Sequence, residues 1–116
     1  MKKEIIDFKD FEVIYLIGQN AKENFDVIDE SSEDDLWFHS KDESSCHVVA
    51  LLPFNIVFEK NEKDMIIKHG ALLCKINTNK LNNLKNVPII YTEIKNITKT
   101  KQKGAVITQN TKTIII

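Results

Sequence analysis

The chain has no arginine, and it has only three glycines, two prolines and one tryptophan among its 116 residues. All sixteen of its basic residues are therefore lysines. A lysine ammonium attracts phosphate as a point charge, whereas two-pronged recognition of guanine or phosphate needs the planar fork of arginine. We therefore expect any contact with nucleic acid to rest on charge attraction.

Long apolar runs and cysteine clusters are also missing. No segment approaches the roughly 20 apolar residues of a membrane-spanning helix, and the first residues have no apolar signal-peptide core. Cys46 and Cys74 lack the C-x-x-C spacing of a zinc site and are too few for a disulfide framework. The sequence thus predicts a cytoplasmic protein with no metal, no cofactor and no membrane partner.

The length and composition are those of an ordinary globular protein, with 42% apolar and 28% charged residues. A chain of this size has room for one core, so we expect a single domain over residues 1–116.

Charge is divided unevenly along the chain. Residues 1–64 hold 16 acidic residues and 7 lysines, whereas residues 65–116 hold 9 lysines and one acidic residue, Glu93. Such a division is typical of a charged interaction surface. The alternative is a compositional bias, since lysine, asparagine and isoleucine are all abundant here.

The spacing of apolar residues predicts both strands and helices. Helical spacing predicts a main helix over residues 62–76, in which Gly70 costs about 1 kcal/mol relative to alanine and therefore indicates a close packing contact. Asn20 with Glu23 three residues later predicts a short helix over 20–30. We expect an α+β fold, a largely antiparallel β-sheet packed with one main helix and a short helix. Its predicted strands are 11–17, 36–40, 46–52, 87–91, 105–108 and 113–116.

The segment Asp-Leu-Trp-Phe-His is the most unusual local feature. Because side chains alternate along a strand, Asp35, Trp37 and His39 share one face while the two residues between them enter the core. A hairpin turn over residues 40–45 would set His39 opposite His47. This composition suits a binding surface, with a flat tryptophan for stacking and polar groups for base edges or a ribose hydroxyl.

Other interpretations of this patch remain open. Trp37 is the kind of residue that also packs beneath a helix. Two facing histidines lack a third ligand for a metal, because Cys46 points to the other face. Asp35 could orient either imidazole, but no nucleophile lies nearby, so catalysis has no support in the sequence.

A second feature is the stretch from residue 95 to residue 103, which has no acidic residue and few apolar ones. We expect an exposed loop whose lysines contact phosphates, helped by hydroxyl and amide neighbours. The alternative is a loop that only adds solubility. The lysines in question are Lys95, Lys99, Lys101 and Lys103, with Lys112 further on.

Several motifs together resemble the NFACT-R domain family, once called DUF814. They agree in order and spacing with the family's G-x-N-x-x-x-N, D-x-W-[FL]-H, S-x-H-V, V-x-V-x-Y-T and K-T-[LI] elements over roughly residues 11–116. The matching residues are Gly18-Gln19-Asn20 with Asn24, Asp35-Leu36-Trp37-Phe38-His39, Ser45-Cys46-His47-Val48, Val87-Pro88-Ile89-Ile90-Tyr91-Thr92 and Lys112-Thr113-Ile114.

The resemblance implies a non-enzymatic RNA-binding module. Such domains occur in ribosome-quality-control factors of the Caliban and NEMF type, where they help to engage tRNA and the ribosome. Some relatives that stand alone are linked to DNA, so the resemblance leaves the type of nucleic acid open. Gln19 replaces a usually basic residue and Phe25 a usually acidic one, so phosphate contacts of this loop are not carried over.

The sequence therefore predicts a module that binds structured RNA, either tRNA or rRNA, with the ribosome as a further partner. The competing hypothesis is a protein–protein adaptor that docks a basic partner through the acidic region 23–43, and an enzyme centred on the two histidines ranks last. The expected nucleic-acid-binding residues are Trp37, His39, His47, Asp35, Lys95, Lys99, Lys101 and Lys103.

Overall fold

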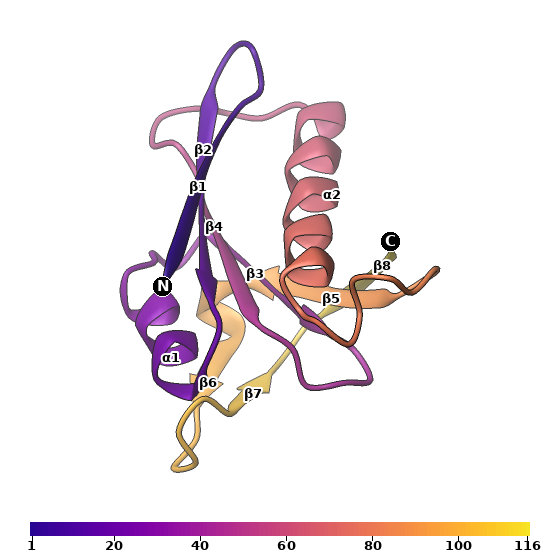
Figure 1. Ribbon diagram of the computed structural model, residues 1–116. Coiled ribbons are helices and arrows are strands. Elements are labelled where there is room, and N and C mark those ends of the chain that lie inside the picture. The colour runs from indigo at the N-terminus through magenta and orange to yellow at the C-terminus, as the bar shows by residue number, and fades with distance from the viewer.

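The computed structural model describes residues 1–116 and contains a six-stranded antiparallel sheet with a layer on each face (Figure 1). The strand order is β1-β2-β4-β3-β5-β8, and β6 and β7 form a separate two-stranded sheet. This arrangement confirms the expected α+β class. The elements are β1 (Lys2–Asp7), β2 (Glu12–Gly18), α1 (Ala21–Asp29), β3 (Leu36–Ser40), β4 (His47–Leu51), α2 (Lys60–Ile76), β5 (Pro88–Glu93), the 3₁₀ turn η1 (Ile94–Asn96), β6 (Ile97–Lys99), β7 (Val106–Thr108) and β8 (Lys112–Ile115).

Helix α2 covers one face of the sheet and closes the main core. Ile66 and Leu73 from the helix join Phe38 and Ile17 from the sheet in one buried cluster. A Cβ added to Gly70 would overlap the ring of Phe38, so helix and sheet approach more closely than a larger residue allows. The predicted packing contact at this glycine is thereby confirmed.

Helix α1 and the β6–β7 hairpin cover the opposite face (Figure 1). Beneath them a smaller buried cluster joins Val27 of α1 to Trp37 and Val49 of the sheet, with Ile97 of β6 packed against it. The predicted capping residue begins α1, since the side-chain oxygen of Asn20 accepts a hydrogen bond from a backbone N–H at 2.9 Å. Neither helix has the length and apolar character needed to cross a membrane.

Two strands were not expected from the sequence. β1 pairs with β2 at the edge of the sheet, and β6 lies inside the segment 95–103 that was predicted to be an exposed loop. That prediction was wrong for the first part of the segment, because residues 97–99 pair with β7 and Ile97 packs against the buried cluster beneath them. Only the turn from residue 100 to residue 105 remains outside regular structure.

Candidate nucleic-acid interface

The tryptophan and the two histidines meet as the hairpin symmetry predicts. Trp37 pairs with Val49 across β3 and β4, and the rings of His39 and His47 lie 4.9 Å apart between centroids. The Trp37 indole stacks parallel to His39 at 5.6 Å and meets His47 edge-on at 5.3 Å. The three rings therefore form one contiguous aromatic cluster.

This cluster is closed to solvent, contrary to the expectation of an open face. Trp37 is only 1% exposed and His47 only 3% exposed, whereas His39 is half-buried. The physical reason is the layer above them, because α1 and the β6–β7 hairpin lie over the face that was expected to be bare. In this fold the Trp37 indole belongs to the core and presents no free face to a base.

Hydrogen bonds fix the imidazoles of the cluster. The indole Nε1 of Trp37 donates to Nδ1 of His47 at 3.1 Å, which requires His47 to carry its proton on Nε2. Burial, with a smaller contribution from the neighbouring His39, lowers the pKa of His47 to about 3. His47 is therefore neutral at physiological pH.

His39 is the member of the cluster that approaches the surface. Its Nδ1 donates to the carbonyl of Ser40 at 2.6 Å, which leaves Nε2 as an available acceptor. Burial, followed by the positive charge of Lys80, lowers the pKa of His39. A neutral imidazole with one free acceptor can accept a hydrogen bond from a hydroxyl or an amino group.

Asp35 does not orient either imidazole, and this expectation is corrected by its hydrogen bonds. Its carboxylate accepts from the backbone N–H of Ser32 at 2.7 Å and from that of Leu52 at 2.9 Å. These bonds tie the segment before β3 to the segment after β4. Asp35 is thus a buried anchor for two loops.

The four lysines of the expected phosphate-binding loop fall into two pairs. Lys95 lies 3.4 Å from carboxylate oxygens of both Asp34 and Glu93. Lys99 pairs with Asp29, and its ammonium lies 4.9 Å from the centre of the Phe25 ring. Asp29 and Asp34 from the first half of the chain, together with Glu93, therefore neutralise these two lysines, so the charge division along the sequence is not preserved at this place in the fold.

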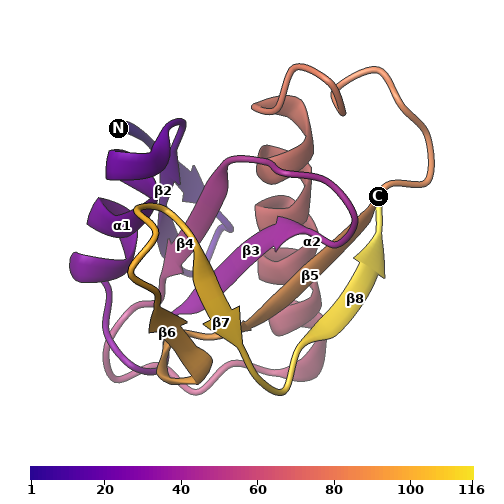
Figure 2. The same cartoon turned by 90° about the horizontal axis from the view of Figure 1, so that it is seen from below.

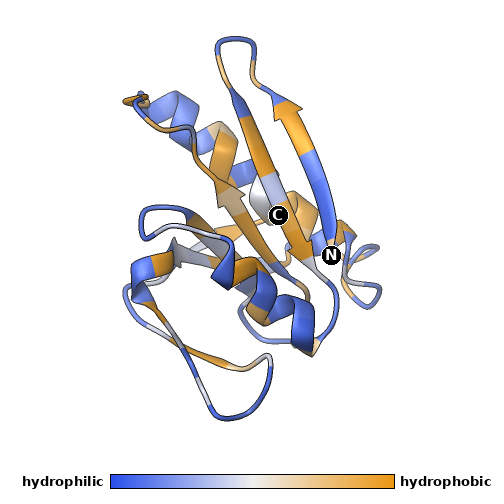
Figure 3. Ribbon diagram, turned by 90° about the vertical axis from the view of Figure 1, so that its left-hand side faces the viewer, coloured by the Kyte–Doolittle hydropathy of each residue, from blue (hydrophilic) through white to orange (hydrophobic).

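Lys101 and Lys103 are exposed and make no ion pair. They lie in the turn between β6 and β7, which reaches the start of α1 (Figure 2). Gly104 makes this contact possible, because it has φ +84° and a Cβ there would lie 2.8 Å from the Cα of Ala21. Figure 3 shows hydrophilic residues in this turn and along the exposed side of α1.

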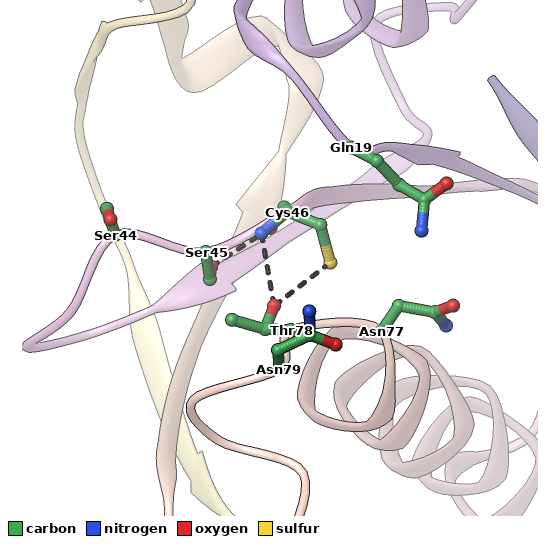
Figure 4. A pocket seen from close by; sticks show the side chains of 7 residues that line it. All are labelled: Gln19, Ser44, Ser45, Cys46, Asn77, Thr78 and Asn79. Atoms are coloured by element: carbon green, nitrogen blue, oxygen red, sulfur yellow. Dashed lines mark hydrogen bonds between the residues drawn. The ribbon is translucent and has the colours of Figure 1, made fainter.

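A polar pocket of about 540 Å³ opens between the end of β2, the start of β4 and the end of α2. Sequence reasoning missed it, although residues 65–92 contain no acidic residue and many asparagines. Lys80 lies at its rim, where Nζ donates to the hydroxyl of Ser44 at 3.0 Å. The pocket (Figure 4) is lined by Gln19, Ser44, Ser45, Cys46, Asn77, Thr78 and Asn79.

A larger groove of about 1310 Å³ lies at the opposite ends of the same strands. Its floor is partly apolar, and the loop beside it exposes Phe54 and Val57 to 89% and 95%. Acidic residues Glu30, Glu33 and Asp34 also line it. An exposed apolar patch beside acidic groups is typical of a protein contact.

These features define a small α+β binding domain with a lysine turn, a half-exposed imidazole and a polar pocket at one end. Residues 6–114 match the model of the family described as the NFACT protein RNA binding domain. The match covers most of the chain, so this chain belongs to the NFACT-R family of RNA-binding domains.

The fold has a counterpart of known structure. The C-terminal part of the fibronectin/fibrinogen-binding protein of Streptococcus suis superimposes with a TM-score of 0.79 at 24% sequence identity. The match covers 100% of this chain and 46% of that one, so this chain spans less than half of the Streptococcus suis structure. A search of curated proteins gave no match.

Proposed function

We propose that this chain is a single, non-enzymatic, cytoplasmic domain that binds structured RNA such as tRNA or rRNA, in the context of translation or ribosome quality control. The observation that supports this most directly is the pair of unpaired lysines, Lys101 and Lys103, in a turn fixed against the start of α1. A lysine on a mobile segment attracts phosphate without a defined geometry, whereas a lysine on an anchored turn presents its charge at a fixed position on the surface.

The residues expected from the sequence have different roles in this proposal. Lys101 and Lys103 contact phosphates, and Nε2 of His39 accepts a hydrogen bond from the RNA. Lys95 and Lys99 contribute less, because RNA must first displace their carboxylate partners. Trp37, His47 and Asp35 are buried and have a structural role: they position the residues at the surface and do not contact RNA.

The chemistry of the buried cluster favours binding over catalysis. The Nδ1 of His47 is occupied by the indole N–H, and burial keeps this imidazole neutral. Cys46 lies in the core cluster on the α2 side of the sheet, away from both imidazoles. No acid–base pair with a nucleophile is assembled here.

The proposal is tested by reversing the two charges. Lys101→Glu combined with Lys103→Glu should weaken binding of tRNA by at least about tenfold in fluorescence anisotropy at low salt, because two phosphate contacts become repulsions. The matched control is Lys63→Glu with Lys68→Glu, two exposed lysines without ion pairs on α2, on the other face of the sheet. An equal loss of tRNA affinity in both double variants, or no loss in either, would refute the role of Lys101 and Lys103 in phosphate binding.

A second candidate function, docking of a protein, is favoured by the groove at the other end of the sheet. Its acidic residues and the exposed Phe54 and Val57 suit a basic amphipathic segment. A synthetic peptide with leucines at helical spacing and lysines between them should bind, and a scrambled peptide of the same composition should not. Phe54→Ser with Val57→Ser should abolish this binding, and unchanged binding would exclude the groove.

A further inference from the structure

We infer that the polar pocket binds ribose 2′-hydroxyl groups, so that the domain prefers RNA to DNA of the same sequence. This inference rests on the proposed function and concerns the same end of the molecule. It begins from the side chains that line the pocket, shown in Figure 4.

The polar side chains at the floor of the pocket are already hydrogen-bonded within the chain. Thr78 Oγ1 accepts from the backbone N–H of Cys46 at 3.1 Å and donates to the carbonyl of Cys74 at 2.9 Å. Ser45 Oγ accepts from the backbone N–H of Ser40 at 2.9 Å and donates to the carbonyl of Cys46 at 3.0 Å. These groups hold the shape of the pocket and have little capacity left for a ligand.

Two amides remain free. The side chains of Gln19 and Asn79 are exposed and make no hydrogen bond within the chain, whereas Asn77 bonds both Lys2 and the carbonyl of Leu73. In Figure 4 Gln19 projects from one side of the pocket toward the asparagines on the other. A ligand in the pocket therefore meets one unpaired carboxamide from each wall.

The chemistry of the lining selects among the parts of a nucleic acid. No charged side chain lines the pocket, and the ammonium groups of Lys2 and Lys80, which bond Asn77 and Ser44 of the lining, are not themselves part of it, so a phosphate has no counter-ion inside the pocket. No aromatic ring lines it either, so an unpaired base has nothing to stack on. A carboxamide offers both donors and an acceptor, and a 2′-hydroxyl needs both.

Lysines flank the pocket on two sides. Lys80 sits at one rim, where Nζ bonds Ser44 at 3.0 Å and lies 3.4 Å from Glu43. On the other side, Gln19 stands two residues before Ala21, against which the turn bearing Lys101 and Lys103 packs. Phosphates held at both sides would place the sugar edge of an RNA strand over the pocket between them.

The test compares a stem-loop RNA with a DNA stem-loop of the same sequence. The unmodified protein should bind the RNA roughly 5- to 150-fold more tightly, which is the range for two neutral hydrogen bonds of about 0.5–1.5 kcal/mol each. Gln19→Ala with Asn79→Ala should lose this preference by weakening RNA binding, while DNA binding changes by less than about twofold. Asn82→Ala with Asn83→Ala, which removes two exposed amides outside the pocket, is the matched control and should leave both affinities unchanged.

The outcomes separate this inference from the function on which it rests. If the unmodified protein bound RNA and DNA with equal affinity, the pocket assignment would be overturned. If reversing the charges of Lys101 and Lys103 abolished binding of both polymers, the role of the lysine turn in phosphate binding would still be supported. The pocket assignment would also be overturned if the Gln19→Ala/Asn79→Ala variant lost affinity for RNA and for DNA to the same extent. If the protein binds neither polymer, the proposed function falls and this inference falls with it.

Discussion

The buried His47 makes the stability of the domain sensitive to mild acid. Its imidazole is 3% exposed, accepts the indole N–H of Trp37 and has no acidic partner that would stabilise a positive charge. Lowering the pH therefore protonates this histidine in the unfolded chain well before it can be protonated in the folded one. The proton binds the unfolded state more tightly, so acid favours unfolding.

The magnitude follows from the two pKa values. An unfolded histidine titrates near about 6.5, whereas burial lowers the folded pKa of His47 to about 3. The stabilisation is complete above the unfolded value and declines as the pH falls from about 6.5 toward about 3. At roughly 1.4 kcal/mol per pH unit, moving from about pH 7 to about pH 5 should cost about 2 kcal/mol. Burial also lowers the pKa of His39 and of His69, which adds to the loss in the same direction.

Urea unfolding followed by far-ultraviolet circular dichroism measures this loss at the two pH values. The comparison variant is His47→Gln, whose side-chain oxygen can still accept the indole N–H but does not titrate. The unmodified protein should lose about 2 kcal/mol more than this variant between pH 7 and pH 5. An equal loss in the two proteins would refute the burial of a neutral imidazole.

Three further outcomes follow from the packing. Gly70→Ala should lower the free energy of unfolding by about 1–3 kcal/mol, because overlap with the Phe38 ring outweighs the roughly 1 kcal/mol gain in helix propensity; a variant more stable to urea would contradict this contact. Asn20→Ala should cost about 1 kcal/mol in the same assay, because the N–H of Glu23 loses its cap, and an unchanged midpoint would show that the cap is not needed. Trp37 emission should be blue-shifted and should not change when RNA is added, since the ring is buried; quenching by RNA would contradict its place in the core.

The local part of the site was predictable from the sequence. Alternation along β3 and a short hairpin turn place Trp37 and the two histidines on one face, and the rings do meet there. Val27 of the predicted helix α1 supplies part of their cover, but the rest was not predictable, because it comes from Ile97 and Val106, some sixty to seventy residues later in the chain than Trp37. A single isoleucine between polar residues gives no strand pattern, so the sequence did not predict β6 or its position over the Trp37 cluster.

The charges show the same limit of local patterns. Lys99 has no acidic neighbour in the sequence and Lys95 has only Glu93, yet they also pair with Asp29 and Asp34, which lie 70 and 61 residues away. Only the fold brings the acidic first half beside the lysine-rich second half. The turn with Lys101 and Lys103 remains unpaired because it extends to the start of α1, where the carboxylate of Glu23 already pairs with the N-terminal ammonium and that of Asp26 with Lys22.

The salt dependence of tRNA binding tests the central claim most directly. If the lysine turn contacts phosphates, the logarithm of the association constant should fall linearly with the logarithm of the salt concentration, with a slope of roughly −2 or steeper. Replacing Lys101 and Lys103 by alanine should reduce the size of that slope by about 1 to 2 and weaken binding at low salt. Binding that does not depend on salt, or an identical slope for the alanine variant, would contradict the account.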